Sequence, residues 1–384
     1  MQGFIIFVLI FGFISPCLCT GLNVETKNNI FNVLQYGARG DGKSDDSQAF
    51  LSAWRRACKA VGMSTLVIPA GRSFMVTKLN FNGPCTAKIL IQLEGEIIAP
   101  PKAAWKGGLI WISVEYVNGL TIDGILHGQG PTWWQCPTCN RPMMLFFHSC
   151  KSLNVRKLRI RNSPRSHTSI TMCQDATFSN IAINSPVTSP NTDGFDIAHS
   201  SNILIEDSYI KSGDDCIALN GGSFFVNATG VTCGPGHGIS VGSLGRNGAN
   251  DQVSNIYVRN CTFIGTTNGA RIKTFSGGSG YAKQITFEQI ILVNVLNPII
   301  IDQNYHIVPK ETDVSVSDVT YRGFTGTSAS DVAIALKCSP SGCFGLLFDQ
   351  NNIVSTQPGK KTSSFCINAH GSARNTIPSV SCLK

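Results

Sequence analysis

Residues Ser201–Ile205 read SNILI, and the same pattern returns as SNIAI at Ser179–Ile183 and as SNIYV at Ser254–Val258. Leu153–Val155 (LNV) and Ser317–Tyr321 (SDVTY) are variants of it. In each segment an Asn or Asp stands beside β-branched or aliphatic residues, at positions 154, 180, 202, 255 and 318. Short strands that return about every 20 to 30 residues, or at a multiple of that period, are typical of a β-solenoid. Asn suits the tight bends between such strands because it tolerates left-handed backbone conformations.

A β-sandwich or a propeller is the alternative architecture for a chain of short strands. Sandwiches join neighbouring strands by hairpins, and the Asn-Gly turns that mark hairpins are sparse here. A solenoid also needs a cap at its open end. The segment from Ser47 to Ala60 places Phe50 and Trp54 four residues apart, which predicts a short amphipathic capping helix. We expect Ser44 or Asp45 to cap it.

Three carboxylates near this helix need a separate interpretation. Asp41, Asp45 and Asp46 lie in the segment that leads into it. We interpret them as loop and cap carboxylates rather than as catalytic groups.

The composition narrows the class of protein. The 384 residues carry 31 Lys and Arg against 23 Asp and Glu, a formal net charge of +8, and 42% are hydrophobic. The apolar share excludes a disordered chain. A basic protein favours an anionic partner. The sequence lacks a Lys/Arg run and an RNA-binding signature, so we expect an acidic polysaccharide rather than nucleic acid.

The beginning of the chain indicates export. An apolar run from Phe4 to Ile14 is followed by Pro16 and by the small residues Cys17 and Cys19, which predicts a signal peptide over 1–19 and one mature domain over 20–384. The alternative is a membrane anchor, but the run falls short of the roughly 20 residues that span a bilayer. Export also fits two glycosylation acceptors, at Asn227 and Asn260.

The cysteine count suits an oxidising compartment. Fifteen cysteines less the two before residue 20 leave 13, so at least one thiol stays free. Two closely spaced pairs are candidate local disulfides: Cys338 with Cys343, and Cys366 with Cys382. The Cys136-Pro-Thr-Cys139 segment has the spacing of a zinc site, but it lacks a second such pair. We therefore interpret it as a disulfide-tied loop.

Candidate catalytic and binding residues are concentrated between residues 191 and 305. They occur as Asn191–Asp193, Gly213–Asp215, Gly236–Gly238, Arg271–Lys273 and Tyr305. The steps from Asp193 to Asp214 and from Asp215 to His237 are nearly equal, and each matches one short solenoid coil of roughly 22 residues. Such a coil places these groups on neighbouring coils, roughly 5 Å apart. Three carboxylates, an imidazole and two cations would then share one patch.

Such a patch supplies an acid and a base together. Like charges held close cannot all ionise, so one carboxyl keeps its proton. Glycoside hydrolysis needs this pairing, and in the inverting version the two carboxyl groups stand roughly 6.5 to 9.5 Å apart. Asp214 and Asp215 are adjacent, so either Gly213 permits a bend that turns both inward or one of them is structural. We expect His237 to hydrogen-bond the acid and tune its protonation.

Arg271 and Lys273 are the candidate cationic residues of the expected site. They are two residues apart on a predicted strand, so both side chains leave one face. Two cations side by side suit a substrate carboxylate. The alternative is that they only form salt bridges with the acids.

These residues resemble those of the polygalacturonase family, the pectin-degrading glycoside hydrolases. The sequences of the motifs resemble those of its plant members. The likeness begins at Phe31 (FNVLQYGARGDG) and continues through SPNTDGF, SGDDCIAL, CGPGHGISVGSLG, RIKTFSGGSG and IDQNY. It implies an all-β fold, a single-stranded right-handed parallel β-helix. It implies that no metal or organic cofactor is needed and that Cys216 pairs with Cys233. One departure is Phe275, at a position where Trp is common in the family.

The resemblance also implies roles for individual residues. Asp214 would protonate the leaving oxygen, and Asp193 with Asp215 would activate water. His237 would stand beside the acid. The residues expected to bind the galacturonate units are Asn191, Arg271, Lys273, Tyr305 and Gln303.

The leading hypothesis is therefore a secreted, monomeric hydrolase of the α-1,4 linkages of homogalacturonan in a cell wall, without a membrane span. Exo-acting galacturonosidase and rhamnogalacturonan hydrolase are near alternatives. A calcium-dependent pectate lyase on a similar solenoid would not need the three aspartates. A catalytically silent wall-binding protein is the alternative from a different class.

Overall fold

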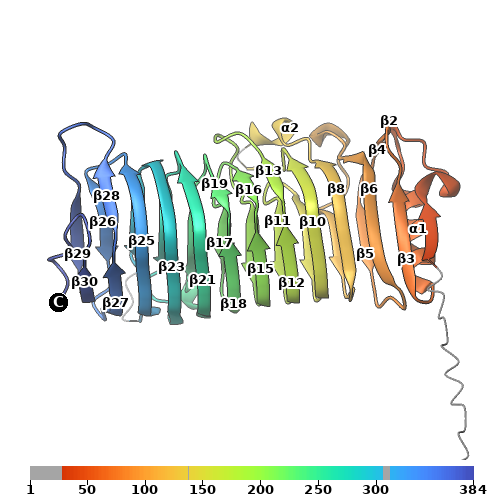
Figure 1. Ribbon diagram of the computed structural model, residues 1–384. Coiled ribbons are helices and arrows are strands. Elements are labelled where there is room, and N and C mark those ends of the chain that lie inside the picture. The colour runs from red at the N-terminus through yellow and green to blue at the C-terminus, as the bar shows by residue number, and fades with distance from the viewer. Residues whose placement is uncertain (1–27, 137, 306–311) are drawn as a thin grey trace, which may run out of the picture.

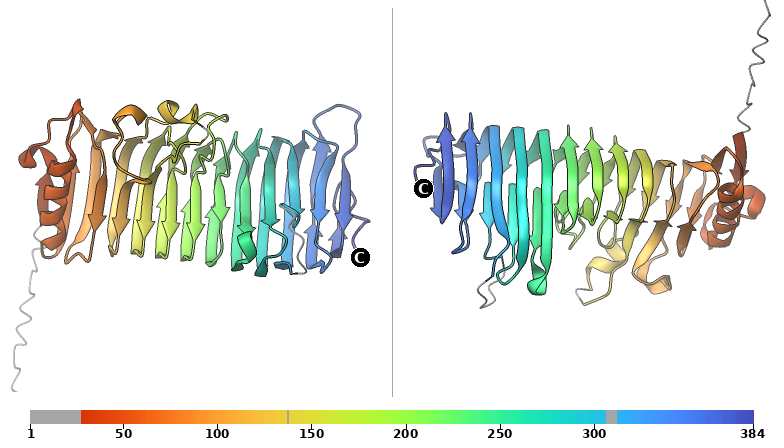
Figure 2. Two further views of the ribbon diagram at one scale, coloured as in Figure 1. Left: turned by 180° about the vertical axis from the view of Figure 1, so that it is seen from behind. Right: turned by 90° about the horizontal axis from the view of Figure 1, so that it is seen from below.

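A computed structural model describes residues 28–136, 138–305 and 312–384. They form one elongated right-handed parallel β-helix, whose coils stack in chain order from the N-terminal helix to the C-terminus (Figures 1 and 2). The solenoid prediction is thereby confirmed. The signal peptide expected over 1–19 lies outside the described residues. Among the described residues, no helix is both long and apolar enough to cross a bilayer.

Within residues 28–136, 138–305 and 312–384, two sheets run along the molecule, and their strands pair in parallel. Sheet A has 19 strands: β1 (Asn28–Asn32), β2 (Asp41–Asp45), β3 (Met63–Ile68), β4 (Ser73–Met75), β6 (Lys88–Ile98), β8 (Leu120–His127), β10 (Lys151–Arg161), β12 (Gln174–Ser179), β13 (Ala182–Asn184), β15 (Ser201–Glu206), β16 (Tyr209–Lys211), β18 (Ser223–Thr229), β19 (Thr232–Cys233), β21 (Asn250–Ile264), β23 (Ser279–Val295), β25 (Ser315–Ser328), β27 (Cys343–Asp349), β28 (Asn352–Ser355) and β30 (Ala369–Arg374). Sheet B has 11 strands: β5 (Leu79–Asn82), β7 (Ile110–Glu115), β9 (Met143–His148), β11 (Thr168–Thr171), β14 (Phe195–Ala198), β17 (Ile217–Leu219), β20 (Ile239–Leu244), β22 (Asn268–Thr274), β24 (Asn297–Asp302), β26 (Val332–Lys337) and β29 (Ser363–Ile367).

The helices in the described part of the chain are few and short. They are α1 (Ser47–Lys59), α2 (Pro131–Trp134) and the 3-10 turns η1 (Val33–Tyr36), η2 (Lys102–Ala104) and η3 (Arg246–Gly248). The predicted capping helix is confirmed as α1, which covers the N-terminal end of the β-helix (Figure 1). The N-cap residue is Asp46, whose side chain makes no capping hydrogen bond, so the expectation that Ser44 or Asp45 occupies this position is wrong. Asp45 still contacts the first turn, since its Oδ1 accepts a hydrogen bond from the backbone N–H of Ser47 at 3.0 Å.

The two neighbouring carboxylates serve the loop before α1. Asp46 accepts from the backbone N–H groups of Arg39 and Gly40, and Asp41 accepts from Lys43 and Ser44. Ser44, an expected cap, thus bonds to Asp41 instead. The interpretation of these acids as structural holds.

The Asn repeat marks two different bends rather than one. Asn202 and Asn255 have φ values of 56° and 59° and share one register, although Asn202 is near the beginning of β15 and Asn255 lies within β21. Asn180 also has a left-handed backbone, but it follows the end of β12. Asn154 lies within β10, paired with Thr177. The spacing of the repeat therefore does not measure one coil of sheet A.

The coils of sheet A also differ in length along the molecule. In the centre, Ile203 pairs with Val226. Towards the C-terminus the coils are longer, and Ile285 pairs with Val319. A single period for the whole chain could not have been obtained from the repeat.

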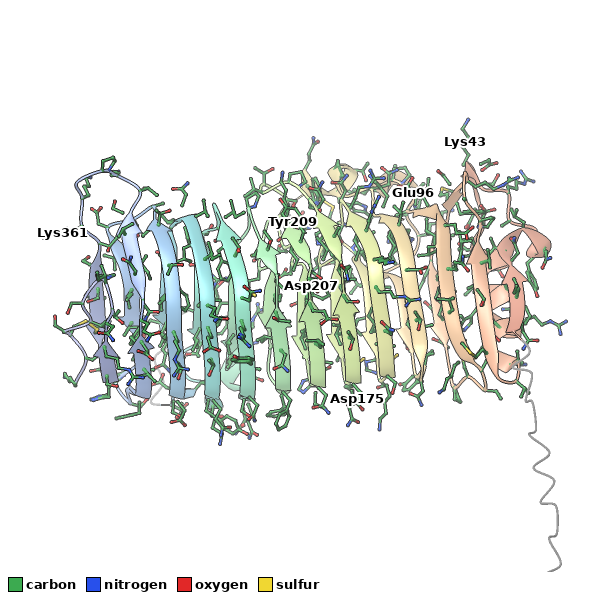
Figure 3. The ribbon with its side chains drawn as sticks, viewed as in Figure 1. Lys43, Glu96, Asp175, Asp207, Tyr209 and Lys361 are labelled. Carbon is green, nitrogen blue, oxygen red and sulfur yellow. A yellow bond between two sulfur atoms is a disulfide. The ribbon has the colours of Figure 1, made fainter. Side chains whose placement is uncertain are left out.

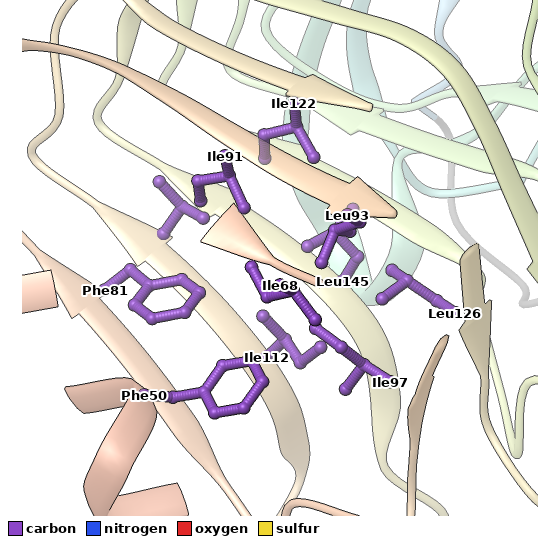
Figure 4. A pocket seen from close by; sticks show the side chains of 11 residues that line it. Phe50, Ile68, Phe81, Ile91, Leu93, Ile97, Ile112, Ile122, Leu126 and Leu145 are labelled. Carbon is purple, nitrogen blue, oxygen red and sulfur yellow. The ribbon is translucent and has the colours of Figure 1, made fainter. Parts of the chain in front are cut away.

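Apolar side chains from both sheets fill the interior. Phe147, Phe178 and Phe195 pack edge to face, with ring centroids 5.7 and 5.4 Å apart. At the N-terminal end, Phe50 of α1 faces a cavity of about 20 Å³ that is lined by aliphatic and aromatic side chains (Figure 4). An apolar cavity of that size stays dry. The outer face of sheet A carries polar side chains such as Asp175 and Asp207 (Figure 3).

Disulfides fix the ends and the middle of the β-helix. Cys338 is joined to Cys343, Cys366 to Cys382, and Cys136 to Cys139. A pairing that the sequence did not single out joins Cys58 of α1 to Cys85. Three buried thiols stay free among the described residues, namely Cys150, Cys173 and Cys261, which agrees with the odd count.

Candidate active site

Most of the predicted site residues lie on, or just before, four neighbouring strands of sheet B in the central coils of the molecule, namely β14, β17, β20 and β22. Asp193, Asp215 and His237 each lie two residues before a strand, namely β14, β17 and β20. The three positions share one register because Phe195 pairs with Ile217, and Ile217 with Ile239. Each of the two steps is therefore one full coil, and the coil length predicted for this part of the chain is confirmed.

Asp215 is the most enclosed of the three aspartates, with 1% of its side chain exposed. Its Oδ1 accepts from the hydroxyl of Ser240 at 2.9 Å and from Nη2 of Arg271 at 2.5 Å, and its Oδ2 accepts from Nζ of Lys273 at 2.8 Å. Arg271 also donates from Nε to Ser240. Arg271 and Lys273 therefore leave β22 on one face, as predicted, and both form ion pairs with the buried carboxylate.

Asp214 points into the same cluster although it is adjacent to Asp215. Its Oδ1 lies 2.9 Å from Nδ1 of His237, and its Oδ2 accepts from Nδ2 of Asn191 at 3.3 Å. One ligand atom from each of Asp214, Asp215 and His237 lies within 4.8 Å of the others. Both acids thus face one site, which agrees with the predicted bend at Gly213.

Gly213 allows this arrangement because the backbone passes very close to the preceding coil. A Cβ at that position would lie 1.9 Å from the carbonyl oxygen of Ser189, which no side chain can accommodate.

The carboxylates differ in their affinity for protons. Burial, together with the charges of Asp196, Asp214 and Asp215, raises the pKa of Asp193 well above its usual range. Burial also raises the pKa of Asp196. At Asp214 burial favours the neutral form, but the hydrogen bond and charge of His237 and the charge of Lys273 outweigh it and lower the pKa. The two pKa shifts are opposite in sign, so Asp193 holds a proton more tightly than Asp214 does.

Sequence reasoning missed several residues that hold the cluster. Asp196 accepts from Ser166 at 2.7 Å and from Asn220 at 3.1 Å. It stands between the buried Phe195 and Ile197 on β14, so strand alternation could have placed it on the outward face, where it pairs in register with Ala218.

Two further residues support the backbone around the aspartates. His167 is fully buried; Nδ1 lies 2.9 Å from the carbonyl oxygen of Asp193 and Nε2 lies 2.8 Å from the hydroxyl of Ser185. Burial lowers the pKa of His167 to about 4, so the ring is neutral. Arg141 donates to the carbonyl of Pro190 and, at 2.7 Å, to Oδ1 of Asn191. These contacts join distant coils, and no local pattern in the sequence marks them.

The expectation for Gln303 is wrong. Its side chain is fully buried; Nε2 donates to the carbonyl of Val314 at 2.7 Å and Oε1 accepts from the backbone of Ser339 at 3.1 Å. The side-chain amide therefore links two backbone segments inside the β-helix and does not face a ligand. Tyr305 is 43% exposed, lies edge-on to Phe275, and has Nζ of Lys273 5.4 Å from its ring centroid.

The acidic cluster is poorly suited to a metal ion. Both oxygens of Asp215 already bind the cations of Arg271 and Lys273, and Nδ1 of His237 is engaged with Asp214. A divalent ion would have to displace two positive charges. Beneath the site, a disulfide joins Cys216 to Cys233, the pair that the resemblance implied, and ties the coil of β17 to β19.

Comparison with known proteins places these features in one family. The family model described as glycosyl hydrolases family 28 matches residues 58–382. A probable polygalacturonase of Arabidopsis thaliana is 43% identical and aligns over 94% of this chain and 82% of its own length. Polygalacturonase-2 of Solanum lycopersicum is 37% identical over 91% of this chain and 82% of its own.

Solved structures show the same architecture. The endo-xylogalacturonan hydrolase of Aspergillus tubingensis superposes with a TM-score of 0.81 at 27% identity and covers 91% of this chain and 99% of its own. Endopolygalacturonase I of Stereum purpureum, solved with two galacturonates, gives a TM-score of 0.64 at 22% identity and covers 85% and 98%. The second likeness, at that identity, shows the shared fold.

Proposed function

This chain belongs to the glycosyl hydrolases of family 28, and on that premise we propose that it cleaves the α-1,4 bonds of polygalacturonate with inversion at the anomeric carbon. One observation carries the proposal. A carboxyl beside an imidazole (Asp214 with His237) shares a site with a second carboxyl that forms ion pairs with two cations (Asp215 with Arg271 and Lys273). An acid and a base are the two groups that glycoside hydrolysis requires.

Asp214 is the proposed general acid. It is the more accessible of the two neighbouring aspartates, with 20% of its side chain exposed against 1% for Asp215. Its pKa is low before substrate binds, but a polyanionic substrate adds negative charge beside it, which raises the pKa of a carboxyl. Substrate binding thus favours the protonated form that can donate to the leaving oxygen.

Asp215 is the proposed base, and Asp193 orients the attacking water with it. Three donors already occupy the oxygens of Asp215, so it is a weak nucleophile and acts through water instead of forming a covalent bond. The oxygens of Asp214 and Asp215 approach within 4.8 Å, closer than the roughly 6.5 to 9.5 Å separation usual for inverting enzymes. The proposal of inversion therefore rests on the three hydrogen bonds to the carboxylate of Asp215 and on the membership of this chain in family 28.

The substrate carboxylates would meet the cations next to the acids. A guanidinium has five N–H donors and an ammonium three, and Arg271 uses Nε and one Nη for Ser240 and Asp215. Their remaining donors can bind a galacturonate carboxylate. Tyr305 offers an exposed ring beside Lys273, and Asn191 lies against Asp214.

The test is the release of reducing ends from polygalacturonate, with and without EDTA. The proposal predicts hydrolysis that EDTA leaves unchanged and that Asp214→Asn lowers at least about 100-fold, since general acids contribute about 10²- to 10⁴-fold. An unsaturated, ultraviolet-absorbing product that disappears with EDTA would establish a lyase. Activity on rhamnogalacturonan alone would establish the nearer alternative, and binding without cleavage a silent wall protein.

The proposed setting is a cell wall, reached by secretion of a monomer. Asn227 and Asn260 are both exposed, as glycosylation acceptors must be. Mass measurement of the protein from a secreting host, before and after removal of N-glycans, tests both sites and the signal peptide over 1–19.

A further inference from the structure

Beyond the catalytic cluster, the outward face of sheet B continues towards the N-terminal end. Asp196 on β14 pairs in register with Ser169 on β11, which pairs with Phe146 on β9. On the other side Asp196 pairs with Ala218 on β17. Neighbouring strands lie about 4.8 Å apart, so Phe146 is roughly 14 Å from the strand that follows Asp214 and Asp215.

Three aromatic side chains gather at this place, which we name the aromatic platform: Tyr116, Phe146 and His148. The rings of Phe146 and His148 are stacked, with centroids 5.7 Å apart and an interplanar angle of 18°. The ring of Tyr116 stands at 89° to His148, also at 5.7 Å. Tyr116 is 54% exposed, and Phe146 and His148 are partly exposed.

The face between the platform and the acids carries small side chains. Ser169 lies in the row between Phe146 and Asp196, and Thr171 and Ala198 continue the neighbouring row from His148. All three side chains are short, and Ser169 is 5% exposed with its hydroxyl 3.4 Å from Sδ of Met143, so neighbouring side chains cover that part of the row. A linear polymer bound at the acids and running along the β-helix axis would therefore pass over this face to the platform.

We propose that the aromatic platform binds a galacturonate unit of the polymer at a distance from the cleaved bond; this rests on the proposed function. Aromatic rings present a partially negative face, which attracts the C–H groups of a sugar ring, and exposed aromatic clusters mark ligand-binding surfaces. Binding energy from remote parts of a substrate helps to orient and distort the reacting bond, so shortened substrates are cleaved with a lower kcat. The platform makes the enzyme selective for long chains.

The test compares polygalacturonate with trigalacturonate in the wild type and in Tyr116→Ala, His148→Ala and the double variant. Trigalacturonate is too short to occupy the acids and the platform together. We expect kcat/KM on the polymer to fall roughly 10-fold in the double variant, as the loss of about 1.4 kcal/mol implies, and kcat/KM on the trimer to stay unchanged. The ratio of the two is measured within each protein, so partial misfolding cancels from it.

Phe344→Ala is the matched control. Phe344 is 50% exposed and stacks on His370 with centroids 4.6 Å apart, but it lies on sheet A. Its polymer-to-trimer ratio should equal that of the wild type. Equal losses on both substrates in the platform variants, no loss on either, or the same change in Phe344→Ala would overturn the proposal. A wild-type protein that cleaves neither substrate would instead refute the proposed function.

Discussion

Nζ of Lys273 lies 2.8 Å from Oδ2 of Asp215, although 58 residues separate the two in the chain. The contact joins β22 to the residue pair before β17, and both side chains are almost fully buried. A buried carboxylate needs its partners to remain ionised. The ion pair therefore contributes to the fold and to the chemistry together.

Lys273→Met should destabilise the protein by about 3 kcal/mol, because breaking a buried ion pair costs about 3 to 5 kcal/mol, and it should abolish activity. The double variant Asp215→Asn/Lys273→Met should recover part of the stability but none of the activity. Urea denaturation of the four proteins of this cycle gives the coupling free energy. Strictly additive losses would mean that the pair does not stabilise the fold.

His237→Ala should extend activity to higher pH while lowering its maximum. Asp214 acts as an acid only when protonated, and His237 lowers its pKa. Removing the imidazole raises that pKa, so the alkaline limb of the kcat/KM profile moves upward. His237→Gln, which can still donate a hydrogen bond, should give a smaller shift. An unchanged or lowered alkaline limb would exclude Asp214 as the acid.

Asp193→Asn should stabilise the protein at neutral pH although it removes activity. The pKa of Asp193 is raised by burial and by its acidic neighbours, so the folded state binds a proton that the unfolded state has released. Stability from this group is complete below the ordinary value of 3.8 and is lost as pH rises towards the raised pKa. Thermal unfolding should therefore favour the variant at pH 7 and not at pH 3, and Asp175→Asn on sheet A is the control. A variant less stable than the wild type at pH 7 would contradict the shift.

Acid should destabilise the wild type through His167. The folded ring stays neutral down to a pKa of about 4, whereas the unfolded ring gains its proton at 6.5. Stability from this group is complete above pH 6.5 and falls by about 3 kcal/mol as pH decreases to 4, at about 1.36 kcal/mol for each pH unit. His167→Gln should lack this part of the slope in urea denaturation, while the exposed His199→Gln should keep it. Identical slopes in all three proteins would refute the account.

The sequence predicted the fold and most of the site because their causes are local or periodic. Alternating β-branched residues predict strands, and the nearly equal steps from Asp193 to Asp214 and from Asp215 to His237 correspond to in-register coils. Arg271 and Lys273 could be placed on one face from their spacing of two.

Other features depend on contacts that no local pattern records. The Asn repeat mixes two bends, since Asn180 and Asn202 serve opposite ends of neighbouring strands. Gln303 was expected beside Tyr305, but the turn after β24 buries its amide. His167 and the partner of Cys58 depend on which coils stack, which the sequence does not state.

The anomeric configuration of the first product tests the central claim most directly. Proton NMR during early turnover of polygalacturonate distinguishes the newly formed reducing ends before they equilibrate. If Asp215, held by Arg271 and Lys273, acts through water, the new ends appear first in the β configuration. New ends that appear first in the α configuration would show a retaining enzyme with a covalent intermediate and would contradict the assignment of Asp214, Asp193 and Asp215.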